Sequence, residues 1–276
     1  MAFEPGIVDL AQRWSVRVDS LKPFPTAFGL PHNFVADAVL TDGTRVVLKI
    51  TGYHDELANE VAALRVWNGN GSACILRADL DRHAILLERI QPGVMLAEFS
   101  DDDDAAVRIT ADLLRQLWIP RSDGLRSLDS WCDAYERNRT ALLAGVDGFP
   151  KQLFARADAL RRVLLESTAD PVALHGDMHH YNVLQSDRAG WLAIDPKGLF
   201  GDRHFDVCQF LRNPFRPVTA AENRQRLDHF SELLDLDRQR LSDWALVHAV
   251  LDACWSFEDG ADWRPKVAYA EETLTY

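Results

Sequence analysis

The stretch His175-Gly176-Asp177-Met178-His179-His180-Tyr181-Asn182 decides the fold of this chain. An aspartate followed by an asparagine five residues later is the spacing of a kinase catalytic loop, where the aspartate accepts the substrate hydroxyl proton and the asparagine binds metal. Asp177 and Asn182 have this spacing. The apolar segments 172–174 and 182–184 are predicted strands that bring these polar residues to a common edge. The stretch therefore predicts phosphoryl transfer, with Asp177 as catalytic base and Asn182 as a metal ligand.

A second carboxylate follows in Ile194-Asp195-Pro196. The sequence between the loop and Asp195 reads as a strand over 181–184, a turn over 186–190 and a strand over 191–194. Such a hairpin brings the chain back to the end of the sheet where Asp177 and Asn182 lie. Asp195 is therefore predicted to be the second metal ligand.

The same letters allow another chemistry. His175, Asp177, His179 and His180 resemble the ligand cluster of a metal-dependent hydrolase, because imidazole and carboxylate groups both suit zinc or manganese. That interpretation gives Asn182 and Asp195 no role, and the chain has no second His-rich segment to complete the site. We predict instead that His175 braces the loop and that the other two histidines are packing or surface residues. The hydrolase stays as an alternative.

Outside this segment the pattern changes once along the chain. Short alternating runs over 33–40, 45–50, 74–79 and 84–88 predict strands, with one helix over 55–67 between them. Beyond Gln91-Pro92-Gly93 the pattern is helical, over 104–118, 128–143, 151–166, 221–234 and 238–258. We expect an α+β fold of two lobes, with a small antiparallel sheet over residues 1–90 that binds nucleotide. Residues 91–276 should form a larger, mainly helical lobe for catalysis and substrate binding.

Lys49 ends the buried-looking strand Val46-Val47-Leu48, where a charge needs a partner. In kinases a lysine on the third strand binds nucleotide phosphates and pairs with a glutamate on a helix. Glu60 is the predicted partner because it shares a helix with the apolar positions Leu57, Val61 and Leu64. Glu56, one turn earlier, is the second candidate.

Two further segments are candidates for nucleotide contacts. The phosphates would lie against the backbone of Phe28-Gly29-Leu30-Pro31-His32-Asn33, in which Gly29 is the single glycine. The main-chain groups of Glu88 and Ile90 would face an adenine edge, since they lead into the predicted hinge. An ordinary edge strand is an equal interpretation of that second segment.

The overall charge bounds the partners. The chain of 276 residues has 30 Lys and Arg against 42 Asp and Glu, a formal net charge of −12, which argues against binding to nucleic acid. An acidic protein attracts a cationic small substrate. Near the end of the chain, Trp255, Glu258 and Asp259 belong to an acidic and aromatic cluster that suits a guanidinium or ammonium group. A helix end followed by a solvated loop is the other interpretation.

The sequence has neither the pattern of a secretion signal at its start nor an apolar run of the roughly 20 residues that span a membrane. We therefore expect a soluble cytoplasmic protein that does not bind membranes.

The chain resembles the aminoglycoside phosphotransferases, specifically the 6-phosphotransferase group that includes streptomycin kinases and hydroxyurea phosphotransferases. Residues 174–184 and 191–202 carry the resemblance, above all Ile194-Asp195-Pro196-Lys197-Gly198-Leu199. It implies a bilobal protein-kinase-like fold and the use of ATP and Mg2+ to phosphorylate a hydroxyl of an aminoglycoside-like antibiotic or of hydroxyurea. It also implies Asp177 as base, Asn182 and Asp195 as metal ligands, and Lys49 as the phosphate-binding lysine.

Two departures limit what the resemblance carries. The nucleotide loop has few glycines, and no motif identifies the residues that contact the acceptor. Asp206 is predicted to cap a helix rather than to act in the site. A kinase of another small alcohol or amino alcohol is the alternative within enzymes. A nucleotide-binding module that has lost turnover is the alternative outside them.

Overall fold

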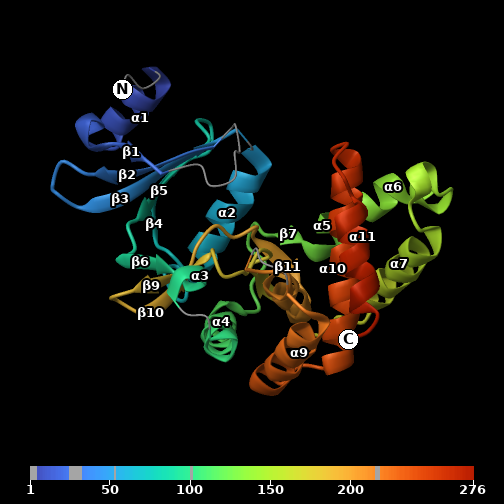
Figure 1. Ribbon diagram of the computed structural model, residues 1–276. Helices are drawn as coiled ribbons and strands as arrows, with labels where there is room; N and C mark the ends of the chain where they lie inside the picture. The colour runs from blue at the N-terminus through green and yellow to red at the C-terminus, as the bar shows by residue number, and fades with distance from the viewer. Residues whose placement is uncertain (1–4, 25–32, 53, 100–101, 215–217) are drawn as a thin grey trace.

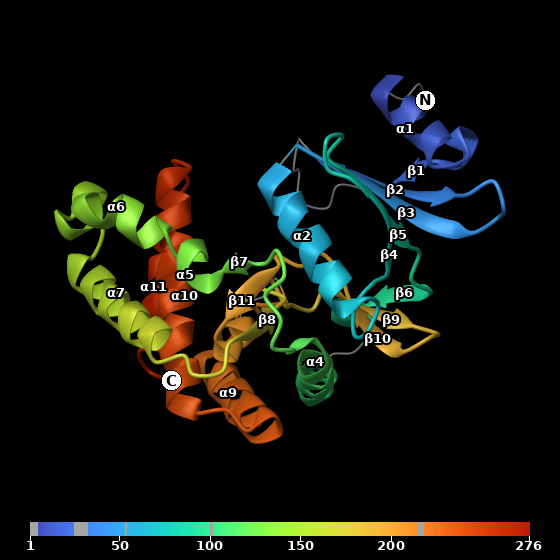
Figure 2. The same ribbon diagram turned by 180° about the vertical axis from the view of Figure 1, so that it is seen from behind.

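The computed structural model describes residues 5–24, 33–52, 54–99, 102–214 and 218–276, and it has two lobes. The predicted phosphate loop around Gly29 lies outside the described residues. The views in Figures 1 and 2 agree that the N-terminal sheet lies on one side of the molecule and helices α5, α6, α7, α10 and α11 on the other. The predicted α+β, bilobal architecture is confirmed, and the predicted boundary after residue 90 falls between β5 and β6.

The small lobe is a five-stranded antiparallel sheet with a helix on each face. The strand order is β1-β2-β3-β5-β4. Gly43, at φ +92°, makes the turn of the predicted hairpin between β2 and β3. The elements are α1 (Pro5–Arg13), η1 (Val18–Ser20), β1 (Lys22–Pro23), β2 (Asn33–Val39), β3 (Arg45–Thr51), α2 (His54–Trp67), β4 (Ile75–Asp79) and β5 (Ala84–Glu88).

The alternation of β3 decides where Lys49 points. Val46 and Leu48 are fully buried in the cluster that includes Leu10 of α1 and Trp14, which follows this helix. Val47 belongs to the cluster on the opposite face, which α2 fills with Leu57, Val61 and Leu64. Since successive side chains of a strand alternate between its faces, Lys49 shares the α2 face with Val47.

The large lobe contains two small sheets and most of the helices. Its sheets have the orders β10-β9-β6 and β7-β11-β8. The elements are β6 (Pro92–Met95), α3 (Leu96–Phe99), α4 (Asp103–Leu117), β7 (Arg126–Ser127), α5 (Leu128–Trp131), α6 (Ala134–Leu143), η2 (Val146–Gly148), α7 (Lys151–Glu166), β8 (Val172–Leu174), β9 (Val183–Ser186), β10 (Gly190–Ala193), β11 (Leu199–Gly201), η3 (Arg203–Val207), α8 (Cys208–Leu211), α9 (Ala220–Leu234), α10 (Arg238–Glu258) and α11 (Arg264–Thr273).

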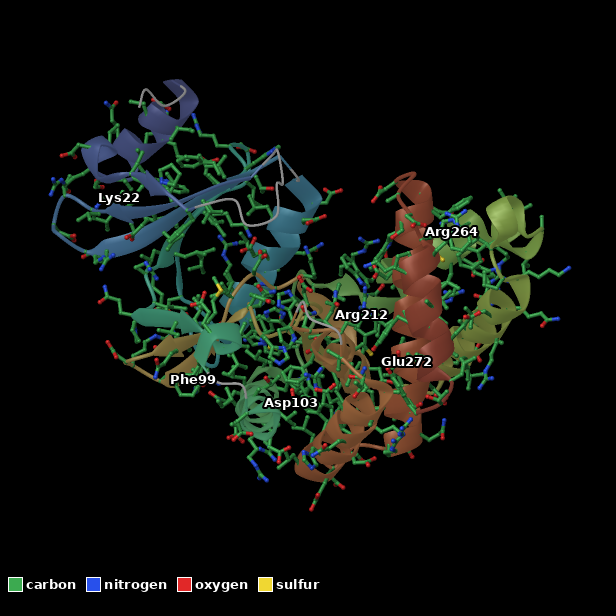
Figure 3. All side chains as sticks on the ribbon, in the orientation of Figure 1. Lys22, Phe99, Asp103, Arg212, Arg264 and Glu272 are labelled. Atoms are coloured by element: carbon green, nitrogen blue, oxygen red, sulfur yellow. The ribbon has the colours of Figure 1, made fainter. Side chains whose placement is uncertain are left out.

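Two helices differ from the prediction. The helix predicted over 128–143 is two helices, because the amides of Asp133 and Tyr135 donate to carbonyls three residues back and interrupt the helical ladder. The helix α11 was not predicted, and its ends are marked in Figure 3 by Arg264 and Glu272. Its apolar face is narrow, with Val267 and Ala270 buried against α10, so its sequence gave a weak periodic signal.

Helix α10 is the centre of the large lobe. It is buried on most of its circumference, and Trp244, Val247 and Leu251 lie in one core cluster with residues of α6, α7 and α11. The catalytic stretch connects the two small sheets, since β8 directly precedes it and β9 directly follows it. No helix among the described residues is long and apolar enough to cross a membrane.

Candidate active site

His175 fixes the start of the catalytic stretch, directly after β8. Its ring is fully buried and stacks on Trp67 of α2. Its Nε2 donates to the carbonyl of Ile194 at 2.9 Å, and its Nδ1 accepts the amide of Asp177 at 3.2 Å. Burial lowers the pKa of His175 to about 4, so the ring is neutral at physiological pH. The prediction that His175 braces the loop is confirmed.

Asp206 anchors the same stretch from η3, and the prediction that it caps a helix is wrong. Its two oxygens accept the amide of Gly176 at 2.6 Å and that of His175 at 2.9 Å, and the indole of Trp118 at 3.0 Å. The cap of η3 is Asp202, whose carboxylate accepts the amide of His204. Asp202 was not considered for this cap, and the fold gives it that task while Asp206 anchors the loop.

Asp177 lies immediately after these anchored amides. Its side chain is 17% exposed. Burial raises its pKa to about 7, and the charges of Lys197 and Arg212 oppose this rise. A carboxyl that changes charge near neutral pH suits a general base.

Asn182 and Asp195 meet at this mouth, as their spacing predicted. The amide nitrogen of Asn182 donates to the carbonyl of Asp177 at 2.9 Å, which leaves its oxygen as the atom available to a cation. Asp195 has φ +57°, a left-handed conformation that aspartate tolerates better than most residues, directly after β10. Its side chain is 48% exposed. One amide oxygen and one partly open carboxylate fit magnesium, which takes one or two protein carboxylates and completes its shell with phosphate oxygens and water.

Lys49 joins the two lobes at the site. Its ammonium donates to Glu60 at 2.8 Å and to Asp195 at 2.5 Å. Burial would lower the pKa of Lys49, but these two carboxylates outweigh it and raise the pKa. The positive charges of Lys49 and Lys197 lower the pKa of Asp195 to about 2. The predicted pairing of Lys49 with Glu60 is present, and Glu56 pairs with Lys197 instead.

The predicted adenine contacts have other partners. The amide of Glu88 donates to the carbonyl of Cys74, and its carboxylate binds Arg188 at 2.6 Å. The carbonyl of Ile90 accepts from the Arg89 side chain, and the Ile90 side chain is buried. These residues tie β5 to the loops beside it, and their contact with a base stays a prediction.

The predicted acceptor cluster lies at the end of α10. Glu258 is bound by Arg137 through both oxygens, at 2.7 and 2.9 Å, and by Asn138 at 2.9 Å. Trp255 packs edge-on against Trp131, and Asp259 ends the helix. Glu258 thus ties α10 to α6, and its part in acceptor binding stays a prediction.

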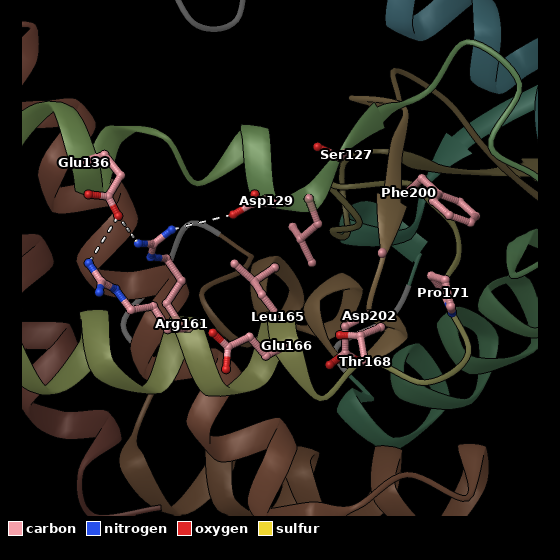
Figure 4. A pocket seen from close by; sticks show the side chains of 13 residues that line it. Ser127, Asp129, Glu136, Arg161, Leu165, Glu166, Thr168, Pro171, Phe200 and Asp202 are labelled. Atoms are coloured by element: carbon pink, nitrogen blue, oxygen red, sulfur yellow. Dashed lines mark hydrogen bonds and ion pairs between the residues drawn. The ribbon is translucent and has the colours of Figure 1, made fainter.

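A cavity of about 700 Å3 lies between α5, α7 and β11, and it contains none of the predicted site residues. Figure 4 presents its polar wall, where Arg161 is bound by Glu136 and Asp129. These charges already satisfy one another, so we do not assign the reaction to this cavity.

Two residues at the site had no predicted role. Lys197 lies next to Asp177 and pairs with α2, and Gly198 has φ +64°. A Cβ atom at Gly198 would lie 2.2 Å from the carbonyl oxygen of Asn59, so only glycine lets this segment, just before β11, pass α2. The sequence Lys197-Gly198 indicates a tight turn at this point. It does not indicate that the turn contacts α2.

Comparisons with known proteins agree with this geometry. The family described as aminoglycoside/hydroxyurea antibiotic resistance kinase matches residues 30–260. The chain belongs to this kinase family. It is 34% identical to a streptomycin 6-kinase of Streptomyces glaucescens, over 95% of this chain and 85% of that protein. It is 36% identical to a hydroxyurea phosphotransferase of Kitasatospora aureofaciens, over 98% of this chain and 78% of that protein.

The fold matches solved phosphotransferases. A mutant of aminoglycoside phosphotransferase APH(4)-Ia, solved with ADP and hygromycin B, superposes with a TM-score of 0.69 over 97% of this chain and 96% of that one, at 17% identity. This match confirms the predicted kinase-like fold, and the family and the curated relatives confirm the predicted phosphotransferase. Membership of a kinase family favours phosphoryl transfer over the hydrolase alternative.

Proposed function

We propose that this member of the family transfers the γ-phosphoryl group of ATP to a hydroxyl of a small antibiotic of the streptomycin or hydroxyurea type. The observation that carries the proposal is the chain of contacts from Glu60 through Lys49 to Asp195, beside Asp177 and Asn182. These five predicted residues, up to 146 positions apart in sequence, thereby lie together at one site. A module that had lost turnover would have no need to keep this arrangement.

The residues divide the chemistry among them. Asp177 accepts the proton of the acceptor hydroxyl and aligns that oxygen with the phosphorus atom. Lys49 binds nucleotide phosphates, and Glu60 holds the lysine in position. Asn182 and Asp195 would hold magnesium, which when bound neutralises charge on the phosphate oxygens. Positioning and charge stabilisation supply most of the rate, because a loose phosphoryl transition state needs little covalent help.

The acceptor is the less constrained part of the proposal. Similarity to a streptomycin 6-kinase and to a hydroxyurea phosphotransferase supports two chemically different acceptors, one polycationic and one neutral. The formal net charge of −12 favours a cationic acceptor through long-range attraction. A kinase of another small alcohol or amino alcohol is the second candidate. Since ATP is a cytoplasmic co-substrate, we also propose a cytoplasmic location.

The test is a screen of ADP release with ATP and magnesium against streptomycin, other aminocyclitols, hydroxyurea and simple amino alcohols. Asp177→Asn is the control for the chemistry, since it keeps the side-chain shape and removes the proton-accepting charge. We expect turnover with streptomycin or hydroxyurea that this variant loses. Turnover with amino alcohols alone would favour the second candidate, and no turnover with any acceptor would refute the proposal.

A further inference from the structure

Lys197 begins at the catalytic stretch itself. Its amide donates to the carbonyl of His175 at 2.7 Å. A Cβ atom placed on Gly176 would lie 3.0 Å from the Cβ of Lys197, so the lysine side chain starts against the residue that precedes Asp177. The backbone on its other side is fixed too, because the carbonyl of Gly198 accepts the amide of Arg126 and its Cα faces α2. Lys197 therefore occupies a defined place between Asp177 and α2.

Two lysines at this mouth are held by two glutamates of one helix. Glu56 and Glu60 are four residues apart and so lie on neighbouring turns of α2. Glu60 binds Lys49 at 2.8 Å, and Glu56 binds Lys197 at 3.4 Å. The two ammonium groups are thus near enough for the charge of Lys49 to act on Lys197, and each contacts a glutamate of the same helix.

The two lysines differ in how firmly they are held. Lys49 has two carboxylate partners within 2.8 Å and is 13% exposed. The distance from Lys197 to Glu56 exceeds the roughly 2.7–2.9 Å of a strong charge-assisted hydrogen bond. Lys197 is also 30% exposed, and Glu56 is 54% exposed, so the pair is partly solvated. A phosphoryl group can replace Glu56 as the partner of Lys197 with little loss of free energy, because the exposed pair is weak. For Lys49 it would have to compete with two carboxylates.

We propose that Lys197 is a catalytic residue whose ammonium binds the non-bridging oxygens of the transferring phosphoryl group, and that Glu56 positions it beforehand. In the step, the acceptor oxygen bonds to the γ-phosphorus and the bond from that phosphorus to the β–γ bridging oxygen breaks. The hydroxyl proton passes to Asp177 and ADP leaves. Lys197 forms no covalent bond and loses no proton. The inference rests on the proposed function and adds to it a charge that acts mainly in the transition state.

The decisive measurement uses ADP, magnesium and aluminium fluoride, which mimics the transferring group and needs no acceptor. Calorimetry gives the affinity for ADP and magnesium with and without the fluoride complex. We expect the parent to gain at least ten-fold in affinity with fluoroaluminate. Lys197→Met should bind ADP within about three-fold of the parent and lose most of that gain. Lys151→Met, at an exposed position on α7, is the matched control.

Kinetics provide the second measurement. With an accepted substrate, Lys197→Met should lower kcat by roughly 100-fold while the KM for ATP changes little, as for loss of a charge that acts in the transition state. Lys197→Arg should recover part of that loss. Glu56→Gln should cost less than about five-fold, because it removes only the positioning partner.

The exchanged pair Lys197→Glu with Glu56→Lys separates this role from a structural tie. A structural pair would be restored by the exchange, in both stability and activity. The proposed role predicts that kcat stays low whatever the thermal stability, because the ammonium group is no longer beside Asp177 and Asp195. A normal fluoroaluminate gain in folded Lys197→Met, or a fully active exchanged pair, would overturn the proposal while leaving kinase activity intact. A parent without any fluoroaluminate gain would overturn the proposed function as well.

Discussion

Replacement of Asp206 by asparagine tests how the large lobe positions the catalytic base. The Asp206 side chain is 1% exposed and lies 2.6–3.0 Å from three N–H donors. Asparagine keeps the shape, but its NH2 group replaces one of the two oxygens and cannot accept a hydrogen bond from the N–H group that faces it. At least one buried N–H then loses its acceptor, which costs about 1–3 kcal/mol. The bonds that survive also change from charge-assisted to neutral.

An opposing effect reduces the loss of stability at neutral pH. Burial raises the pKa of Asp206 from 3.8 to about 6 despite its three donors. At about 1.4 kcal/mol per pH unit, the buried anion costs the native protein roughly 3 kcal/mol above pH 6, and the neutral amide avoids this cost. We therefore expect Asp206→Asn to differ from the parent by no more than about 2 kcal/mol at pH 7.5.

The same reasoning gives a sign for the pH dependence. The folded carboxyl binds its proton more tightly than the unfolded one, so this group makes the free energy of unfolding fall as the pH rises from about 4 to 6. Asparagine lacks that dependence. The destabilisation caused by the substitution should therefore be about 2 kcal/mol larger at pH 4.5 than at pH 7.5. Urea unfolding at both pH values measures it, with the exposed Asp170→Asn as control.

Activity should respond more strongly than stability. The amides that lose their anchor belong to His175 and Gly176, directly before Asp177. A shift of about 1 Å in a positioned group can cost roughly 100-fold in rate, so kcat should fall between ten- and 100-fold at pH 7.5. A folded variant with kcat within three-fold of the parent and a pH-independent difference in stability would refute the anchoring role.

Four further predictions follow from the site. Asp177→Asn should lower kcat at least 100-fold without changing ATP affinity, and the parent's kcat/KM for the acceptor should rise as the pH passes about 7, where this buried carboxyl ionises; activity within a few-fold would contradict this. Asp195→Ala should abolish the magnesium dependence of ATP binding in calorimetry, whereas unchanged dependence would leave it a structural role. Gly198→Ala should cost at least 2 kcal/mol more in urea unfolding than Gly260→Ala, whose φ is nearly equal but whose surroundings are open; equal losses would exclude the clash with α2. Glu258→Gln should raise the acceptor KM about ten-fold at low salt if the acceptor binds there, and only lower the Tm if the carboxylate serves Arg137.

The sequence was most informative where a pattern has one structural solution. Alternating apolar residues and an Asp-Gly turn predicted the hairpin of β2 and β3, and the helix over 151–166 was predicted with the bounds that α7 has. Asp177 and Asn182 are five residues apart and lie on one loop. Their proximity therefore did not depend on a correct prediction of the rest of the fold. Lys49 was correctly paired with Glu60 because a charge at the end of a buried-looking strand needs a partner.

The contacts that were missed join segments with no local pattern. Asp206 and Gly176 are 30 residues apart, and neither segment has a sequence pattern which indicates that η3 contacts the catalytic loop. The choice between Glu56 and Glu60 depended on which lysine each meets, and Lys197 comes from a turn 141 residues further along the chain. Such pairings are set by how the lobes pack, which apolar periodicity does not encode.

The same packing explains why one short helix can organise this site. Helix α2 covers the sheet with Leu57, Val61 and Leu64, so its position is fixed by the core of the small lobe. Glu60 then reaches Lys49 within that lobe, while Glu56 reaches Lys197 of the large lobe. Asn59, between them, touches Gly198 so closely that a methyl group would separate the two lobes at this point. Any displacement of α2 must therefore change both lysines together, which makes the relative position of the lobes a direct determinant of the charge around Asp177.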